Sequence, residues 1–260
     1  MRENFIEVIK PNTLEATLLA QINWERIPRH VAVIMDGNGR WASMRGRPRI
    51  FGHRAGVESV RAIVDTGARL GLKALTLYAF STENWKRPRL EVSALMRMLR
   101  KYLQIESENL DRQNIRFQAI GRIKDLPEAV REDLNAASEV TKNNDGMILS
   151  IALNYGGRAE IVDACRSAAK ELMARHENLD NLSEVEIANN LYTRGLPELD
   201  LLIRTSGEMR VSNFLLWQVA YSEIFVTKTL FPDFRRVNLL EAIVDFQNRD
   251  RRFGDVTSKG

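Results

Sequence analysis

Six short apolar runs alternate along this chain with longer segments that have helical spacing. The runs predict strands at residues 31–35, 74–80, 115–121, 147–153, 199–203 and 224–227. Helical patterns cover 55–70, 90–112, 127–141, 159–175, 183–192 and 239–249, with a short helix predicted at 214–221. Strands that alternate with helices predict a parallel sheet covered on both faces. We therefore expect one α/β domain with a six-stranded, mainly parallel sheet flanked by helices.

The whole chain of 260 residues reads as one domain, because no internal repeat, low-complexity tract or flexible linker interrupts the alternation. Residues 1–28 carry acids but no secretory apolar segment, so we expect an N-terminal extension followed by the main domain at 29–260. No apolar run approaches the roughly 20 residues needed to cross a bilayer. The single cysteine, Cys165, excludes a disulfide within the chain and leaves the cytoplasm as the expected compartment.

The first strand runs directly into a stretch rich in glycine and arginine. Its last apolar residue, Met35, is followed by an aspartate. Glycines there would let the backbone turn tightly and bring bare N–H groups close to a ligand. A carboxylate at a strand end, a glycine loop and several guanidinium groups predict a site for a phosphate and its metal. The stretch comprises Asp36, Gly37, Asn38, Gly39, Arg40, Trp41, Arg45, Arg47, Arg49 and His53.

Two other interpretations of this stretch compete with a phosphate and metal site. Residues 37–42 match the dinucleotide-binding pattern G-x-G-x-x-[GA]. That match is weak, because the charge of Asp36 would oppose a pyrophosphate without a cation, and Glu58, the acid at about the expected distance, lies in a helical pattern. No Walker A phosphate loop occurs in the chain. We read Asp36 as a Mg²⁺ anchor, and the alternative is an Asx-type turn that opens the glycine loop.

The second strand ends in a short polar loop with an unusual mixture of side chains. It offers hydroxyls, an acid, an amide, an aromatic ring and a guanidinium group, on Ser81, Thr82, Glu83, Asn84, Trp85 and Arg87. Pro88 ends this loop, so Ser81 and Thr82 could instead be plain turn residues. The apolar Phe80 and Trp85 favour a ligand that has both a hydrocarbon part and an anionic part.

The loop after the fifth strand places two arginines and a serine around another glycine. Arg204 directly ends a buried strand, where an unpaired charge is costly, although a solvated arginine pair is the plainer interpretation. Arginine binds phosphate through parallel hydrogen bonds, so the loop predicts an anion site. Its candidate residues are Arg204, Arg210, Val211 and Ser212. Further along, Glu223 lies between apolar segments and needs a basic residue or a metal as its partner.

Ligands of parallel sheets bind beyond the carboxyl ends of the strands, so these loops should converge on one composite site. The net charge is +4, and the arginines cluster near glycine loops, which favours a focused anionic ligand. A nucleic-acid binder would need basic and aromatic residues on one exposed face, and here they lie on separate loops. The apolar stripe of helix 90–112 is either core or one wall of a hydrophobic channel; it comprises Val92, Leu95, Met96, Leu99 and Leu103.

Seven segments, in this order along the chain, resemble the cis-prenyltransferase family, its bacterial undecaprenyl diphosphate synthases in particular. They are HVAVIMDGNGRWA (30–42), FGHRAG (51–56), LTLYAFSTENWKRP (75–88), NYGGR (154–158), DLLIRTSGEMRVSNFLLWQ (200–218), YSE (221–223) and RRFG (251–254). The resemblance covers nearly the whole chain, from about residue 29 to residue 254. It implies the cis-prenyltransferase fold with a hydrophobic tunnel, a homodimer and dependence on Mg²⁺.

The same resemblance implies an enzyme that extends an allylic diphosphate, such as farnesyl diphosphate, with isopentenyl diphosphate units and makes each new double bond cis. The expected product is a long polyprenyl diphosphate, undecaprenyl diphosphate for the cell-wall lipid carrier. We expect a cytoplasmic protein with peripheral contact to the inner face of the membrane and no nucleic-acid partner. The alternative is a partner subunit of the same fold without catalytic activity, and the presence of the motif residues together in one chain argues against it.

By position in these motifs, the resemblance also implies roles for single residues. Asp36 matches the acid that holds Mg²⁺, Glu223 a second acid associated with the metal, and Asn84 the position associated with proton acceptance. Met209 stands where bacterial members often have histidine, which weakens a side-chain metal ligand there. The residues implied at the allylic diphosphate are Gly37, Asn38, Gly39, Arg40, Trp41, Arg49 and His53. Those matching a flexible loop that closes on substrate are Ser81, Thr82, Glu83, Trp85 and Arg87, and those at the isopentenyl diphosphate site are Arg204, Arg210, Val211 and Ser212.

Overall fold

The computed structural model describes residues 3–249 and contains the predicted six-stranded sheet. All paired strands run parallel, in the spatial order β3-β4-β2-β1-β5-β6. The strands are β1 (His30–Ile34), β2 (Ala74–Ser81), β3 (Arg116–Ile120), β4 (Ile148–Tyr155), β5 (Leu201–Arg204) and β6 (Glu223–Val226). The sheet confirms the α/β prediction. The RRFG segment at 251–254 lies outside the described residues.

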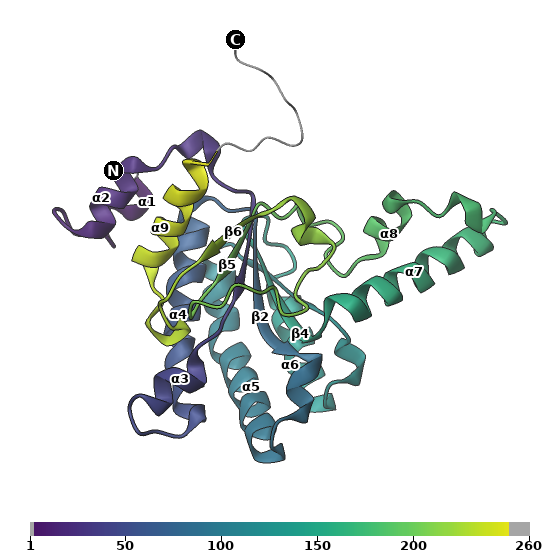
Figure 1. Cartoon of the computed structure of the whole chain (residues 1–260), viewed down its shortest axis with the longest axis horizontal. Coiled ribbons are helices and arrows are strands. Elements are labelled where there is room, and N and C mark those ends of the chain that lie inside the picture. The colour runs from purple at the N-terminus through teal and green to yellow at the C-terminus, as the bar shows by residue number, and fades with distance from the viewer. Residues whose placement is uncertain (1–2, 250–260) are drawn as a thin grey trace, which may run out of the picture.

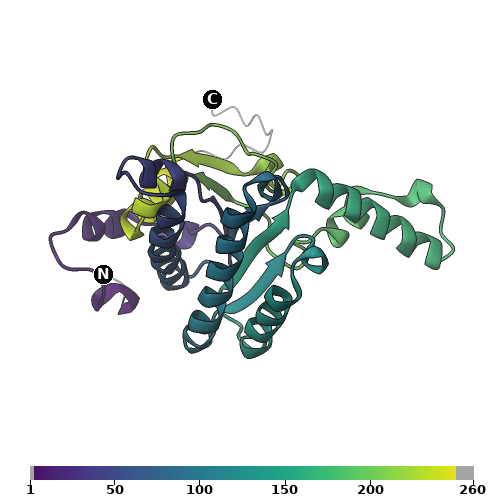
Figure 2. The same cartoon turned by 90° about the horizontal axis from the view of Figure 1, so that it is seen from below.

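Helices pack around this sheet, and α7 and α8 project from the body as an arm (Figures 1 and 2). The helices are α1 (Glu3–Ile6), α2 (Leu14–Gln21), α3 (Asn38–Ser43), α4 (Arg49–Leu70), α5 (Arg89–Arg112), α6 (Glu128–Val140), α7 (Gly157–Ala174), α8 (Glu184–Asn190) and α9 (Arg236–Gln247). None of these helices within residues 3–249 is both long enough and apolar enough to cross a bilayer.

The larger hydrophobic core lies on one face of the sheet. Alternate strand residues such as Val31 and Val33 point into it, as expected from the two-residue period of a strand. Side chains of α2, α4, α5, α6 and α9 complete this core, and Phe5 and Leu19 belong to it as well. Residues 3–28 therefore pack on the same core as the main domain.

The other face of the sheet is covered mainly by an irregular segment. Ala32 and Ile34 lie in a smaller core with Phe214 and Leu215. The helix predicted at 214–221 is wrong, because only a short 3-10 turn, η5 (Gln218–Tyr221), forms there. Leu215 has a left-handed backbone (φ 46°), which interrupts any helix through this segment.

A second departure from prediction lies between β1 and β2. The helix predicted at 55–70 begins at Arg49, directly after Pro48, and the predicted glycine loop contains α3. The added residues 49–54 include Arg49, Gly52, His53 and Arg54, which interrupt the apolar spacing that identifies a helix. Gly52 explains why the two helices pack so closely, since a Cβ there would lie 1.9 Å from the carbonyl oxygen of Asn38.

Candidate active site

The carboxyl ends of β1, β2 and β5 meet at one edge of the sheet, because β1 lies between the other two strands. Met35 and Asp36 follow β1, Arg204 ends β5, and Ser81 ends β2. Nη2 of Arg204 donates a hydrogen bond to Oδ2 of Asp36 at 2.9 Å. The first and fifth loops thus converge as the sequence predicted.

Arg204 is a buried cation, with 4% of its surface exposed. Besides Asp36, its guanidinium donates to Oγ of Ser212 at 2.7 Å and to the carbonyl of Arg210. Its Nε is buried and has no hydrogen-bond partner among residues 3–249. A solvated arginine pair is therefore wrong for Arg204. Arg210 does keep an exposed side chain, which pairs with Glu208 at 2.5 Å.

Asp36 sits in a turn that holds its backbone and one carboxylate oxygen. Its N–H donates to Oγ1 of Thr205 at 2.9 Å, and its Oδ1 accepts a hydrogen bond from the N–H of Gly37 at 2.7 Å. Gly37 has φ 102°, and a Cβ there would lie 2.9 Å from Cδ2 of Leu230, so this turn requires glycine. Asp36 thus forms the local turn and also lines the cavity.

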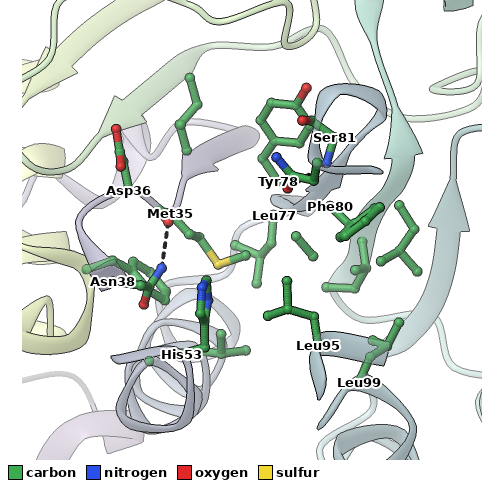
Figure 3. Close-up of a pocket in the computed structure, with 18 of the residues that line it drawn as sticks. Met35, Asp36, Asn38, His53, Leu77, Tyr78, Phe80, Ser81, Leu95 and Leu99 are labelled. Carbon is green, nitrogen blue, oxygen red and sulfur yellow. Dashed lines mark hydrogen bonds between the residues drawn. The ribbon is translucent and has the colours of Figure 1, made fainter. Parts of the chain in front are cut away.

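The rest of the predicted glycine loop is the first turn of α3. Asn38 begins this helix, and its Nδ2 donates to the carbonyl of Met35 at 3.0 Å (Figure 3). The Oδ1 of Asn38 is buried without a hydrogen-bond partner in the described chain. Gly39 lies against the guanidinium of Arg49, 3.0 Å from where a Cβ would stand. The turn therefore brings an arginine of α4 next to the backbone of α3.

Arg40 and Trp41 of α3 bind other parts of the protein and do not line the cavity. Arg40 Nη2 donates to Oγ of Ser206 at 2.6 Å and to Oε1 of Glu208 at 2.9 Å. Trp41 Nε1 donates to Oδ1 of Asp233 at 2.8 Å. In this structure both side chains anchor α3 to the neighbouring loops.

Residues 81–87, here called the 81–87 segment, include the turn η2 (Thr82–Lys86). Two asparagines hold this segment, one near the end of β4 and one in the irregular segment after β5. Asn154 accepts a hydrogen bond from Nε1 of Trp85 at 2.7 Å, and Nδ2 of Asn213 donates to Oε1 of Glu83 at 2.9 Å. Both asparagines have left-handed backbones, with φ 46° and 62°. Such a conformation suits asparagine better than most residues and is common at functional sites.

Asn84 of this segment faces the cavity with its amide nitrogen available. Its Oδ1 accepts a hydrogen bond from the N–H of Ser81 at 3.3 Å, and its Nδ2 has no partner among residues 3–249. Arg87 also lines the cavity, and its Nη1 donates to Oε1 of Glu91 at 3.1 Å. The segment therefore presents hydrogen-bond donors to whatever the cavity holds.

The cavity between these loops has a volume of about 660 Å³. Polar residues line it at the strand ends and the start of α4, here called its mouth, and apolar residues line the remainder, here called its interior. Figure 3 shows Asp36, Asn38 and His53 on one side and Leu95 and Leu99 of α5 on another. Other apolar lining residues are Val57, Val60, Leu77, Phe80, Met96, Met98, Leu103, Ile151, Leu153 and Phe231. The apolar stripe of α5 is thus both core and cavity wall. A polar mouth over an apolar interior suits a ligand with a charged head and a hydrocarbon tail.

Comparison with known proteins identifies the family. A family model described as "Putative undecaprenyl diphosphate synthase" matches residues 34–254. The chain belongs to the isoprenyl transferase (cis-prenyltransferase) family. A curated isoprenyl transferase from Heliobacterium mobile is 52% identical over 95% of both chains, and one from Clostridium tetani is 50% identical over 91% of this chain and 92% of the relative.

Two solved structures are similar to this isoprenyl transferase. Lavandulyl diphosphate synthase from Lavandula x intermedia, in complex with dimethylallyl diphosphate, has a TM-score of 0.86 and 38% identity, over 89% of this chain and all of that one. A probable undecaprenyl diphosphate synthase from Campylobacter jejuni has a TM-score of 0.72 and 34% identity, over 88% of this chain and 99% of that one. The predicted fold and family are confirmed.

Most of the predicted site residues of this family member do line the cavity. They are Asp36, Gly37, Asn38, Gly39, Arg49, His53, Ser81, Glu83, Asn84, Arg87, Arg204 and Ser212. Those that do not are Arg40, Trp41, Thr82, Trp85, Arg210, Val211 and Glu223. Except for Glu223, these outlying residues belong to the loops that frame the cavity. Asn154 and Asn213 belong to the family motifs NYGGR and DLLIRTSGEMRVSNFLLWQ but were given no role, and the available signal was an asparagine near a predicted strand end, where turns form.

His53 is a neutral side chain in this site. Burial, together with the charges of Arg87 and Arg49 and against that of Glu91, lowers its pKa to about 4. Its Nε2 is buried and lacks a hydrogen-bond partner within the described chain. At neutral pH, His53 can therefore offer a hydrogen bond to a ligand but not a positive charge.

Glu223 lies apart from the cavity, at the amino ends of the parallel strands. It begins β6 and pairs with Leu201, whereas Arg204, the partner of Asp36, ends β5. Three residues along a strand span roughly 10 Å. The carboxylate of Glu223 instead accepts a hydrogen bond from Nη1 of Arg249 at 2.9 Å. The partly exposed acid therefore has a basic partner within the chain, and its predicted role as a second metal-associated acid stays a prediction.

The cavity offers few protein ligands for a metal. Residues 3–249 contain no group of three or more His, Cys, Asp or Glu side chains that could hold one. Asp36 and Glu83 are the acids that line the cavity. Mg²⁺ commonly takes one or two carboxylates and completes its shell with water and substrate phosphate oxygens. Asp36 among cationic side chains therefore fits Mg²⁺ that arrives with a diphosphate, and does not fit a metal held by protein alone.

Proposed function

We propose that this isoprenyl transferase condenses isopentenyl diphosphate with an allylic diphosphate, farnesyl diphosphate, and repeats the step to make a long cis-polyprenyl diphosphate. The observation that carries the proposal is the single cavity with Asp36, Arg49 and Arg204 at its mouth and a hydrocarbon-lined interior. Undecaprenyl diphosphate, the precursor of the cell-wall lipid carrier, is the product we favour.

The polar mouth is suited to two diphosphates. The buried guanidinium of Arg204 has an unused Nε–H, and Arg49 and Arg87 approach from other elements. Arginine donates paired hydrogen bonds to phosphate oxygens, so these cations can fix both the orientation and the charge of the substrates. The structural relative described with dimethylallyl diphosphate, an allylic diphosphate, supports this substrate class.

The apolar interior is suited to the growing chain. Burial of each CH₂ group contributes roughly 0.8 kcal/mol, so every added isoprene unit strengthens retention of the intermediate. Leu95, Met96 and Leu99 of α5 form part of the wall that the chain would contact. We propose that the room along the path of the chain through this interior influences the product length.

Asp36 is the residue we propose to hold Mg²⁺ on the allylic diphosphate. Bound there, Mg²⁺ would neutralise charge on the departing diphosphate. Arg204 is already fixed against the carboxylate of Asp36 and can take up part of the same charge without moving. In the reaction, the C1–O bond of the allylic diphosphate breaks, a bond forms from C1 to the double bond of isopentenyl diphosphate, and a proton leaves C2.

Asn84 is proposed as the residue that orients the proton-accepting group. Its carbonyl oxygen already accepts a hydrogen bond from Ser81, which leaves its amide nitrogen as the group that faces substrate. An amide is also a poor base. We therefore propose that Asn84 donates a hydrogen bond to a diphosphate oxygen or water that takes the proton. Asn84→Ala should lower kcat more than it raises KM, and an unchanged kcat would contradict this role.

The test of function is incorporation of labelled isopentenyl diphosphate with farnesyl diphosphate and Mg²⁺, followed by sizing of the products. We expect chain growth that needs Mg²⁺ and is abolished by Asp36→Ala. Asp180→Ala, at an exposed acid on η4 (Leu179–Asn181), is the matched control and should retain wild-type activity. No incorporation with any allylic starter, in a folded protein, would favour the non-catalytic partner subunit.

We also propose that the enzyme is a cytoplasmic homodimer with peripheral membrane contact. The family resemblance supports the dimer. The lone cysteine is compatible with a reducing compartment. A lipid product supports contact with a membrane surface.

A further inference from the structure

A second concave surface, here called the basic crevice, is lined by residues of α4 and α5, two helices that also line the cavity. Figure 1 shows where these two helices lie in the fold. The crevice has a volume of about 540 Å³. Arg54 and Arg61 line it from α4, and Arg97 and Lys101 line it from α5. Each pair is spaced four or seven residues apart, so each helix presents its cations on one face.

Only a thin wall of side chains separates this crevice from the cavity. Val57, Met98 and Tyr102 line both of them. Val57 comes from α4 and the other two from α5. All three side chains are only partly buried, which is unusual for residues in the middle of a core. The crevice is therefore the outer side of the cavity's own wall.

The product of the proposed function is larger than the cavity. A cavity of about 660 Å³ is the size that holds a drug-sized ligand. A hydrocarbon of many isoprene units outgrows such a space. The crevice adjoins the apolar part of the cavity, beside Met98, and offers the nearest continuation for the chain.

The charge of the crevice is positive and partly uncompensated. Arg61 pairs with Glu58 at 2.6 Å and with Glu106 at 2.5 Å. Arg97 and Lys101 are exposed and have no ion-pair partner among the described residues. Aliphatic side chains, including the exposed Ile105, lie beside these cations. Cations interspersed with aliphatic groups on a helix face are typical of surfaces that bind anionic bilayers.

We propose that the basic crevice docks this protein on an anionic lipid bilayer and that the Val57–Met98–Tyr102 wall is the exit through which the hydrocarbon chain passes into it. The exit rests on the proposed function, whereas the docking does not. Arg97 and Lys101 would meet lipid phosphates, and Ile105 would reach the acyl boundary. The chain would leave sideways between α4 and α5, so that it enters lipid without crossing water.

The docking test is flotation of the full chain with vesicles of phosphatidylcholine alone or of a three-to-one mixture with phosphatidylglycerol. The wild type should bind the mixed vesicles, and less so as salt is raised. Each cation near an anionic bilayer raises the vesicle partition coefficient about fivefold. The double charge reversal R97E/K101E should therefore lower the partition coefficient at least about 20-fold. R97Q/K101Q, a milder change, should lower it by a smaller factor and guards against misfolding.

The matched control is K73E/R116E. Both residues are exposed at the amino edge of the sheet, away from the crevice, and the net charge changes equally. This control should bind mixed vesicles within about twofold of the wild type. Wild-type binding by R97E/K101E, equal loss in the control, or no binding of mixed vesicles by the wild type would each overturn the docking surface.

The exit is tested by product release. In detergent, R97E/K101E should match the wild-type rate of isopentenyl diphosphate incorporation, because neither residue lines the cavity. With mixed vesicles in place of detergent, steady-state turnover should rise severalfold for the wild type and the control, and not for R97E/K101E. Equal stimulation of all three proteins would overturn the exit. If the wild type made no product under any condition, the proposed function and the exit would fail together, and flotation would still decide the docking.

Discussion

Replacing Asn213 with aspartate tests whether the 81–87 segment is held closed by the loop that carries Ser212. Nδ2 of Asn213 donates to Oε1 of Glu83 at 2.9 Å, and its Oδ1 accepts a hydrogen bond from the N–H of Arg158 at 2.9 Å. N213D keeps an oxygen for Arg158 and changes only the contact with Glu83. The contact becomes a pair of carboxylates, so the substitution replaces this one hydrogen bond with a repulsion between like charges.

The expected size of the effect follows from this geometry. Partial burial raises the pKa of Glu83, and hydrogen bonds, first among them the one from Asn213, lower it. The net shift of this pKa is downward, so Glu83 is ionised at neutral pH. A hydrogen bond to a charged group contributes about 1.5 kcal/mol at the low end, which suits an exposed acid. Two like charges about 3 Å apart in a water-like dielectric cost about 1.4 kcal/mol more. Loss of the bond plus repulsion amounts to about 3 kcal/mol, or roughly a hundredfold in the closing equilibrium.

Two assays report this equilibrium independently. Lys86 is exposed within the segment, so the rate of tryptic cleavage after it should rise steeply in N213D. In the incorporation assay, kcat/KM for isopentenyl diphosphate should fall by up to about a hundredfold. The double variant E83Q/N213D removes one carboxylate, and its new amide can donate to the new acid. It should recover most of the cleavage protection and most of the activity lost in N213D.

The reasoning would be refuted if E83Q/N213D were no better than N213D in either assay. It would also fail if N213D were cleaved at the wild-type rate while losing activity, because Asn213 would then act on substrate and not on the segment. A lower melting temperature with unchanged local cleavage would point to the cap on α7, where Arg158 lies.

Three further predictions concern stability, metal and product length. Burial lowers the pKa of His30 and of His53 to about 4, so the unfolded chain binds more protons than the folded chain between about pH 6.5 and 4. The free energy of unfolding should therefore fall as the pH drops through that window, by up to about 3 kcal/mol per histidine. In urea titrations, His53→Gln should reduce this dependence of the unfolding free energy on pH. Glu223→Gln should leave the Mg²⁺ concentration needed for activity unchanged and should lower the free energy of unfolding in urea by about 1 kcal/mol or less. A severalfold rise in the Mg²⁺ requirement would instead mean that this acid reaches a metal in an assembly. Leu99→Trp should shorten the polyprenyl product on chromatography by filling the apolar interior, and an unchanged length would place the chain elsewhere.

The number and the parallel direction of the strands could be predicted from the sequence because apolar runs and helical spacing are local properties, whereas the spatial order of the strands came from the structure. Strand ends in a parallel sheet share one edge, so the meeting of Asp36 with Arg204 followed from the pattern alone. The mixed polar and apolar loop at 81–87 likewise indicated an amphipathic ligand. The family motifs then named the residues that line the cavity.

Other features were decided only by the tertiary structure, because they depend on which side of an element meets which neighbour. Glu223 resembled a site residue by motif, yet its position at the start of β6 places it at the far edge of the sheet. Asn154, near the end of β4, and Asn213, in the segment after β5, meet the 81–87 segment only in the folded chain. The wall shared by cavity and crevice exists only because α4 and α5 pack with partly buried side chains between them. Contacts of this kind join residues far apart in sequence, and no local pattern encodes them.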